Sequence, residues 1–316
     1  MLVPRGSAML SMSSCFRRRL SSTRWLLILF AAAVPMLTFA AAPVRELKIP
    51  DPYAGQKKVL IIGDIHTGAQ IAHDGVSHAL ATLEHLGRES GAYVAFIRTD
   101  TQLLTKGDVF GSGDYAQGGS KQARGRNLDY FDAVVFYTNG SPPMTDDQKR
   151  DLLSFVHEDG KGFVAVHSAT ASFYDWPEYG EMVGGYFDNH PWNVFAAPVI
   201  VERPDFPGWQ KLPHSFTMRD EMYQYKAPYS RDKVDVLASL DASKLDLTNQ
   251  NVHRSDRDFP LAWVKSYGKG RVFSSTLGHT DQSWDDPRVQ TIYLEGIRWV
   301  LRMSDAQVKP HPAMAR

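Results

Sequence analysis

The chain has 316 residues, of which 43% are hydrophobic, 22% charged and 11% aromatic, and its formal net charge is zero. This length and hydrophobic content suffice for one large α/β domain built around a single core. No basic run is interleaved with aromatic residues, so we expect no nucleic-acid partner.

Residues 1–42 are predicted to be an export leader. An apolar run at 25–39 is followed by small residues at 40–42 that could be cleaved, and it is preceded by Arg17, Arg18, Arg19 and Arg24. The run is shorter than the ~20 residues of a bilayer span, so we expect a periplasmic or secreted protein. A retained membrane anchor is the alternative, and an uncleaved leader would be the only membrane contact. Residues 2–7 match a protease site used in recombinant expression, a tag remnant.

The leader also distorts the charge balance and contains the only cysteine, Cys15. It holds five arginines and no acidic residue, so the other residues carry 30 basic and 35 acidic side chains, a formal charge of −5. Without cysteine, the mature chain can form no disulfide, thiolate nucleophile or sulfur-ligated metal site. Any site must be built from His, Asp, Glu, Ser and Tyr.

After a lead-in at 43–56, strands and helices alternate. Continuous apolar runs predict buried parallel strands at 58–64, 93–97, 132–137 and 163–166. Helices are predicted at 72–86 and 145–158, the second opened by a capping box of Thr145 and Gln148. Residues 101–127 show little periodicity and are predicted to form a loop region. The alternation favours a doubly wound, mostly parallel sheet flanked by helices.

The second half of the chain is less regular. A helix is predicted at 174–186, and short strands at 198–202 and 234–239 lie between loops rich in Pro and Asp. A β-hairpin at 261–265 and 271–275 precedes a closing amphipathic helix at 287–302. The predicted domain therefore spans 57–303, and a polar tail covers 304–316.

His167 is the first candidate for chemistry, because it directly follows the apolar strand at 163–166. Ala165 and Ala169 flank it at a spacing of two, which is typical of a tight strand-to-helix elbow that exposes its apex residue. An imidazole at the apex suits a metal ligand or an acid–base group better than a nucleophile. Ser168 fits a hydrolase elbow less well, since Val166 and Thr170 flank it.

His66, His190 and His279 occupy similar places, each close to a glycine or to the end of a predicted element. His167 and His279 both follow strands whose carboxyl ends should meet at one crevice. Converging imidazoles without cysteine suit a divalent metal such as Zn, Mn, Fe or Ni, although no HxH or HExxH spacing is present. Any one of these histidines alone is more often a buried, hydrogen-bonded structural residue.

Carboxylates and aromatic residues complete the candidate set. Asp64, Asp188, Asp220 and Glu221 are the carboxylates, and 220–223 is predicted to be a loop in which two adjacent acids favour solvated surface. Aromatic rings can stack on sugars, which makes substrate-binding candidates of Tyr174, Trp176, Trp192 and Tyr223. The same rings are also ordinary core material.

Four ordered segments, at 162–169, 184–191, 220–223 and 267–279, resemble the hallmark segments of the ThuA-like family, named for trehalose utilisation. The resemblance covers about residues 57–303. It implies a flavodoxin-like fold similar to that of class I glutamine amidotransferases, which carry a Cys nucleophile at the elbow. His167 stands in the comparable place here, so amidotransferase activity does not carry over.

The resemblance further implies a role in sugar catabolism, acting on 3-keto-glycosides made by a partner sugar dehydrogenase. It suggests metal binding by His167, His279 and His190, and base or ligand roles for Glu221 and His66, His66 being the looser match. We therefore expect an enzyme that cleaves 3-keto-glycosides with a divalent metal and without an organic cofactor. The alternative is a non-catalytic sugar-binding or accessory protein.

Overall fold

A computed structural model describes residues 51–66, 73–109 and 126–313 of the chain, with the side chains of 64–66 excepted. The predicted leader, the tag remnant and the first part of the lead-in lie outside these ranges, as does much of the predicted loop region at 101–127. Among the described helices, none combines the length and apolar composition that a membrane span requires.

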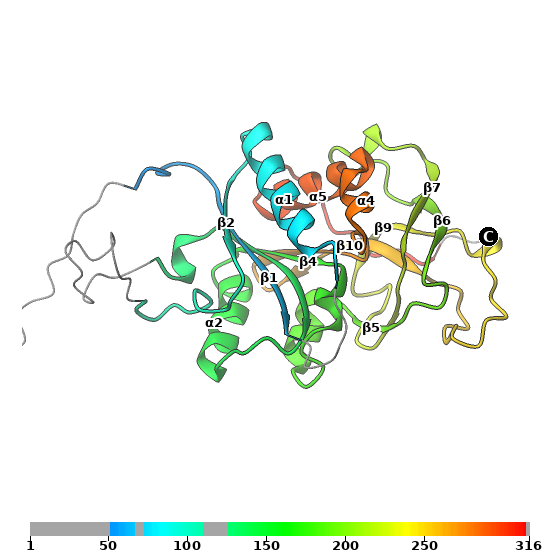
Figure 1. Ribbon diagram of the computed structural model, residues 1–316, viewed down its shortest axis with the longest axis horizontal. Helices are drawn as coiled ribbons and strands as arrows, with labels where there is room; N and C mark the ends of the chain where they lie inside the picture. Colours follow the sequence, from blue (N-terminus) through cyan, green and yellow to red (C-terminus); the bar gives the residue numbers. More distant parts are fainter. Residues whose placement is uncertain (1–50, 67–72, 110–125, 314–316) are drawn as a thin grey trace, which may run out of the picture. The chain divides into compact units, whose positions relative to one another are not determined.

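The described chain forms an α/β fold around a nine-stranded mixed sheet (Figure 1). The strands are β1 (Lys58–His66), β2 (Val94–Arg98), β3 (Ala133–Gly140), β4 (Gly162–Val166), β5 (Tyr186–Asn189), β6 (Val194–Val201), β7 (Ser215–Glu221), β8 (Gln224–Lys226), β9 (Asp235–Leu240), β10 (Pro260–Tyr267) and β11 (Gly270–Ser275). The large sheet has the order β2-β1-β3-β4-β11-β10-β9-β6-β7, and β5 and β8 form a separate antiparallel ribbon.

The parallel core is the first five strands of that order. Its order corresponds to the flavodoxin-like arrangement 2-1-3-4-5, with β11 as the fifth strand. β3 and β4 are buried almost throughout, which explains why their sequences read as continuous apolar runs. The predicted α/β, doubly wound fold class is confirmed.

Four antiparallel strands extend this core beyond β11. The predicted hairpin is present as β10 and β11, which pair from Tyr267 and Gly270 to Ala262 and Ser275. The predicted strands at 198–202 and 234–239 correspond to β6 and β9. The prediction of a loop at 220–223 was wrong for Asp220 and Glu221, which end the edge strand β7, whereas residues 222–223 do form a short connection to β8.

Helices cover both faces of the sheet (Figure 1). They are α1 (Val76–Ser90), α2 (Asp146–His157), α3 (Pro177–Val183), α4 (Asp281–Asp285) and α5 (Pro287–Val300). α1, α4 and α5 pack together on one face, while α2 and α3 lie on the other. The predicted capping box at Thr145 and Gln148 opens α2, and the closing helix starts at Pro287 as predicted.

Two helix predictions had the wrong bounds, one being too long and the other displaced by four residues. The predicted helix at 174–186 is only α3, which Pro177 starts at its first position and Gly184 ends in the left-handed conformation. The predicted helix at 72–86 begins instead at Val76 and runs to Ser90. His73 therefore precedes α1 rather than lying inside it, and this difference bears directly on the site.

Candidate metal centre

The elbow at His167 is present and is conformationally unusual. β4 ends at Val166, and a 3₁₀ helix, η3 (His167–Ala171), follows without any linker. His167 has φ +46°, a left-handed conformation that costs a non-glycine residue about 1–2 kcal/mol. Its side chain is completely buried, and its Nδ1 lies 2.5 Å from the carbonyl oxygen of Thr276. Nδ1 therefore donates to that carbonyl, which leaves Nε2 as the acceptor atom.

A rigid loop after β11 positions His279. Its turn is made by Gly278, with φ +109°, whose carbonyl oxygen accepts hydrogen bonds from Tyr137 Oη at 2.7 Å and from Trp284 Nε1 at 2.9 Å. The buried carboxylate of Asp220 accepts the backbone N–H groups of Gly278 at 2.7 Å and His279 at 3.1 Å. These contacts fix the His279 backbone before its imidazole enters the site.

Asp220 also connects this loop to Glu221, the last residue of β7. Its Oδ1 accepts the Glu221 N–H at 2.9 Å in addition to that of His279. One carboxylate thus holds two candidate ligands at a fixed separation. Burial raises the pKa of Asp220, although His167 and the backbone donors act in the opposite direction.

Three ligand atoms from these segments form a nearly regular triangle. His167 Nε2 lies 3.1 Å from His279 Nδ1 and 3.5 Å from Glu221 Oε2, and His279 Nδ1 lies 3.2 Å from the same carboxylate oxygen. Metal–ligand bonds of about 2.0–2.2 Å in a tetrahedron place neighbouring ligand atoms roughly 3.4 Å apart. The three atoms therefore have the separations of one face of such a site.

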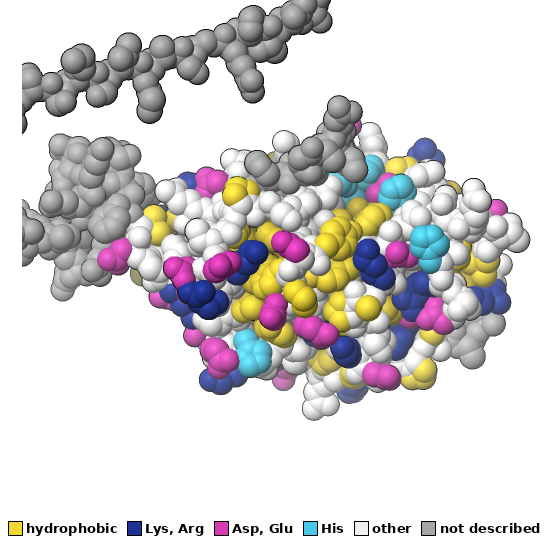
Figure 2. All heavy atoms as spheres, turned by 90° about the horizontal axis from the view of Figure 1, so that it is seen from below, with side chains coloured by type: hydrophobic (Ala, Val, Ile, Leu, Met, Phe, Trp, Pro, Cys, Tyr) yellow, Lys and Arg dark blue, Asp and Glu magenta, His cyan; other side chains and the backbone are white. Residues whose placement is uncertain are grey.

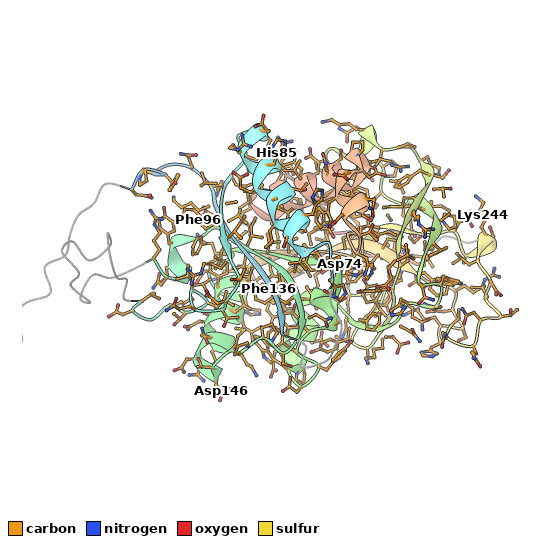
Figure 3. The ribbon with its side chains drawn as sticks, in the orientation of Figure 1. Asp74, His85, Phe96, Phe136, Asp146 and Lys244 are labelled. Atoms are coloured by element: carbon orange, nitrogen blue, oxygen red, sulfur yellow. The ribbon has the colours of Figure 1, made fainter. Side chains whose placement is uncertain are left out.

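His73 supplies a fourth candidate ligand. Single ligand atoms from His73, His167, Glu221 and His279 all lie within 4.8 Å of one another. We call these four residues the histidine–glutamate cluster. The His73 ring centroid is 5.2 Å from those of both His167 and His279, and Asn139 Nδ2 lies 3.5 Å from its Nδ1. His73 immediately precedes Asp74, a residue just before α1 that is labelled in Figure 3.

The residues of the cluster fit a divalent metal in their chemistry. Imidazole nitrogens with one carboxylate oxygen are a donor set that Zn, Mn, Fe and Ni accept. The hydrogen bond from His167 Nδ1 to a backbone carbonyl is the support that metal-ligating histidines usually have, because it fixes the tautomer and directs Nε2 at the ion. The buried cluster could therefore hold a metal ion.

The members of the histidine–glutamate cluster differ in how their surroundings shift their pKa values. Burial lowers the pKa of His73 to about 3, so this ring is neutral at physiological pH. Burial alone would raise the pKa of Glu221, but the neighbouring imidazoles of His167 and His279 outweigh it and hold that pKa well below its usual value. The hydrogen bond to Glu221 raises the pKa of His279. Without a metal, a proton on His279 offsets the carboxylate charge.

Two further predicted residues border the cluster. Tyr223 is buried, and its Oη lies 2.7 Å from His167 Nε2. His190 lies outside the cluster but close to it, with Nδ1 3.7 Å from Glu221 Oε1 and 3.2 Å from Asn193 Oδ1. The side chain of His190 is 40% exposed. His66 ends β1 beside Gly140, and its side chain lies outside the described residues.

The structure does not bring the remaining aromatic candidates to the cluster. Trp176 is 6% exposed and packs on Phe173 and Tyr179 in the core beneath α3. Tyr174 is exposed, but its ring is tilted against Tyr186 and lies below the Lys226 ammonium group. The indole of Trp192 packs on Phe195 and Phe259 and donates to the Asp246 carbonyl.

One face of the molecule combines apolar and imidazole side chains. Figure 2 shows histidine side chains gathered at one end of an apolar patch on the face viewed there. The ribbon of β5 and β8 carries Phe187, whose ring lies 4.4 Å from Tyr223 and 5.8 Å from His190.

Sequence reasoning missed His73, although its neighbours offered one signal. The Asp-Gly pair at 74–75 breaks a helix and marks a turn, which would have placed His73 in a loop before α1. Gly75 is required there because a Cβ at this position would lie 2.9 Å from the His279 carbonyl oxygen. The close backbone approach at Gly75 is what brings His73 alongside the His279 loop.

Comparisons with known proteins agree with this architecture. The family described as ThuA, trehalose utilisation, matches residues 58–300, which is more than half of the chain. Among curated proteins, none matches this chain.

Two ThuA-like proteins of known structure have the same fold. A ThuA-like protein from Bacteroides uniformis ATCC 8492 is 26% identical, with a TM-score of 0.59 over 80% of this chain and 95% of that chain. A ThuA-like protein from Parabacteroides merdae ATCC 43184 is 18% identical, with a TM-score of 0.58 over 80% of this chain and 92% of that chain. The structural matches also include a β-galactosidase from Bacillus circulans, at 11% identity and a TM-score of 0.44, covering 78% of this chain and 31% of that one.

Proposed function

The chain belongs to the ThuA family, and from that premise we propose that it is an exported, metal-dependent enzyme of sugar catabolism that cleaves 3-keto-glycosides. The observation that carries the proposal is the buried triangle of His167, Glu221 and His279 with His73 beside it. Four ionisable side chains from four separate segments would be expensive to bury together unless they held a charged ligand.

The reaction needs a metal or another electrophile because a glycosidic bond is otherwise a poor target for elimination. A ketone at C3 acidifies the hydrogen on C2. A base removes that proton, the electron pair forms a C1–C2 double bond, and the C1–O bond breaks to release the alcohol, which takes up a proton. Water then adds at C1 while C2 regains a proton. The net change is hydrolysis, with no oxidation or reduction.

The histidine–glutamate cluster would hold the metal, which supplies a Lewis acid for the C3 carbonyl. His190 is the best-placed base. Its Nδ1 donates to Asn193 Oδ1, so the Nε2 lone pair of the half-exposed ring is available for the C2 proton. Glu221, which contacts three imidazoles, serves better as a ligand than as the base. Burial raises the pKa of Tyr223 well above its usual value, so its hydroxyl stays neutral and cannot serve as the base.

The setting of the reaction completes the proposal. The leader would export the chain, so that it acts on a small carbohydrate in the periplasm or outside the cell. A 3-keto-glycoside must first be made by oxidation of the secondary alcohol at C3, a step that the proposed elimination and hydration do not include. We therefore include an upstream sugar dehydrogenase as the source of substrate.

Metal analysis combined with turnover tests the proposal. We expect one divalent metal per chain after mild dialysis, and we expect release of the alcohol from methyl 3-keto-glucoside to stop in chelator and to return when metal is added back. His167→Ala should lose both metal and turnover, whereas His157→Ala, on the exposed end of α2, should keep both. Full turnover in chelator would remove the metal from the proposal, and sugar binding without any turnover would favour the non-catalytic alternative.

A further inference from the structure

We propose that Asp188, Gln224 and His253 form a second sugar subsite beside the histidine–glutamate cluster, which holds the departing ring of a two-ring keto-glycoside. The inference rests on the proposed function and assigns residues of this chain to the second ring of its substrate. None of the three residues takes part in the chemistry described above.

Gln224 is the centre of this arrangement. It is completely buried at the start of β8, where its Nε2 donates to Asp188 Oδ2 at 3.1 Å and to the Asn251 carbonyl at 2.8 Å. Its Oε1 accepts the backbone N–H of His253 at 3.0 Å. Both donor hydrogens and the acceptor of one buried amide therefore join β5 to the 251–253 segment. This makes the geometry of Asp188 and His253 a fixed property of the fold.

The two side chains that Gln224 fixes present hydrogen-bond acceptors. His253 Nδ1 lies 2.7 Å from Asp188 Oδ2, and as the donor in that pair it leaves Nε2 of the neutral ring as an acceptor. Both of these contacts to Asp188 use Oδ2, so Oδ1 faces away from them. The His253 side chain is 51% exposed and that of Asp188 is 21% exposed. Two acceptors side by side at a surface suit the adjacent hydroxyl donors of a sugar ring.

The subsite is close to the cluster because the two share the same short segments. Asp188 precedes His190 by two residues and Gln224 follows Glu221 by three, so the Cα separations are at most about 7 Å and about 11 Å. The same two segments contact each other at both places. His190 Nδ1 lies 3.7 Å from Glu221 Oε1, and Gln224 Nε2 donates to Asp188 Oδ2 at 3.1 Å. A sugar ring fills a separation of this size.

Phe187 links the two places with an apolar wall. Its ring packs edge-on against Tyr223, which contacts His167, and it stacks on His190. A two-ring ligand could therefore place its oxidised ring at the cluster and its second ring at Asp188 and His253, with Phe187 between. The second ring would be recognised through its hydroxyl groups, which would donate hydrogen bonds to Asp188 and His253.

Calorimetry with unoxidised sugars tests the subsite directly. Metal-loaded protein is titrated with trehalose, which has two rings, and with methyl α-glucoside, which has one. We expect trehalose to bind at least about tenfold more tightly than methyl α-glucoside. His253→Ala should remove that advantage and change the Kd of methyl α-glucoside by no more than about twofold. His253→Gln, whose amide reaches towards the position of Nε2, should restore part of the advantage. His85→Ala, on the exposed surface of α1, is the matched control (Figure 3).

The outcomes separate this inference from the proposed function. Equal affinity of the wild type for the two sugars would overturn the subsite. So would a loss of affinity in His253→Ala that is equally large for both sugars. Absence of trehalose binding at millimolar concentration would also overturn it, whatever the turnover of methyl 3-keto-glucoside. Failure to turn over that substrate, with the His253-dependent preference intact, would overturn the proposed reaction and leave the subsite standing.

Discussion

At the scale of single residues, the candidate metal centre combines histidines whose protonation equilibria differ. Burial holds the pKa of His73 near 3, so no proton has to leave it when a metal binds above pH 4. The pKa of His279 is raised by its hydrogen bond to Glu221, so in the metal-free protein it keeps a proton above its usual titration range. A metal has to displace that one proton.

Metal affinity should therefore fall as the pH falls through the raised pKa of His279. Below that pKa we expect about a tenfold loss for each pH unit, since one proton competes with one ion. Above it the affinity should be flat, because Glu221 is already ionised and His73 is neutral. Calorimetry in buffers of different ionisation enthalpy measures the protons released. Release of no proton at pH 6 would contradict this assignment.

Asp220 is a positioning residue whose replacement should weaken the metal site without touching it. An amide in place of the carboxylate keeps one acceptor oxygen and turns an NH2 group towards backbone donors of Gly278, His279 or Glu221. We expect Asp220→Asn to lower metal affinity by about 10–100-fold, the range that applies to partners of metal ligands. A competition assay with a coloured chelator measures it.

The matched control for this substitution is Asp246→Asn, in an exposed turn where the side chain accepts hydrogen bonds from the backbone N–H and hydroxyl of Thr248. It should bind metal as wild type does. If Asp220→Asn binds metal with unchanged affinity, the loop after β11 does not depend on the carboxylate, and the positioning role is wrong.

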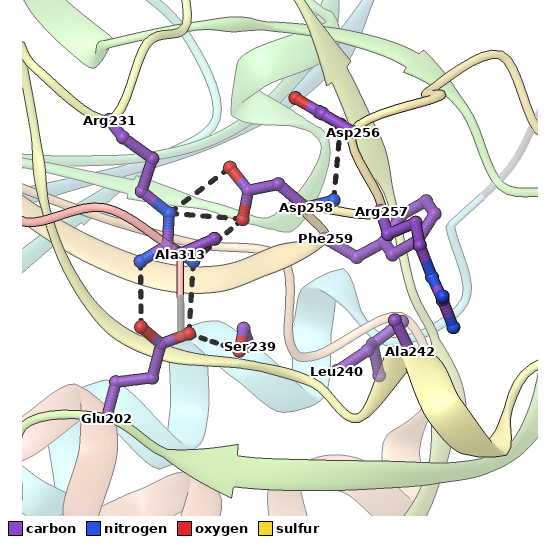
Figure 4. A pocket seen from close by; sticks show the side chains of 10 residues that line it. All are labelled: Glu202, Arg231, Ser239, Leu240, Ala242, Asp256, Arg257, Asp258, Phe259 and Ala313. Carbon is purple, nitrogen blue, oxygen red and sulfur yellow. Dashed lines mark hydrogen bonds and ion pairs between the residues drawn. The ribbon is translucent and has the colours of Figure 1, made fainter. Parts of the chain in front are cut away.

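At the scale of elements, the antiparallel extension contains its own buried ionic network. Arg231 forms hydrogen bonds with both oxygens of Glu202, at 2.7 and 3.0 Å, and with Asp258, at 2.7 Å (Figure 4). Glu202 is 1% and Asp258 4% exposed at the side chain, and a pocket of about 250 Å³ adjoins them. One guanidinium group thus compensates two buried carboxylates and joins three separate segments.

Removal of this guanidinium should destabilise the whole domain. Arg231→Met leaves two buried carboxylates without their shared cation, which costs about 3–5 kcal/mol of unfolding free energy. Urea denaturation followed by fluorescence measures the change. Arg150→Met, which removes an exposed ion pair with Asp147 on α2, should cost no more than about 1 kcal/mol. A loss of similar size in both variants would show that the network contributes no more than a surface pair.

The parallel core could be predicted from the sequence because its strands are buried on both faces. β1, β3 and β4 therefore read as uninterrupted apolar runs, and the elbow after β4 follows from small residues around His167. The edge strand β7 could not be predicted in this way. Its buried positions include Asp220 and Glu221, so the apolar alternation that marks a half-buried strand is broken at the candidate ligand and its neighbour.

The site could be predicted only in part, because only some of its residues follow a local apolar pattern. His167 and His279 follow apolar strands, and local pattern therefore indicated them. His73 and the contact between Glu221 and the His279 loop depend on how β7 and the start of α1 meet the carboxyl ends of the parallel strands. That meeting is a tertiary arrangement with no local period in the sequence.

At the scale of the whole molecule, a metal in the histidine–glutamate cluster would tie together segments that are far apart in the chain. The four ligands come from the segment before α1, the elbow after β4, the end of β7 and the loop after β11. β4 and β11 are neighbours in the parallel core, whereas β7 is the edge of the antiparallel extension. Metal binding should therefore stabilise the domain as a unit.

Metal removal should lower the thermal midpoint. An ion present at a hundred times its Kd stabilises the native state by about 2.7 kcal/mol, and for a domain of this size each kcal/mol moves Tm by roughly 2–4 °C. We expect a difference of about 5–10 °C between metal-loaded and chelator-treated protein in a calorimetric scan at neutral pH. Glu221→Gln should show little of that difference, because an amide oxygen is a weak ligand beside three imidazoles, whereas His78→Ala, on the exposed side of α1, should retain it in full. Equal midpoints with and without metal in the wild type would mean that the four side chains are clustered for another reason, with the proton on His279 sufficient to offset Glu221.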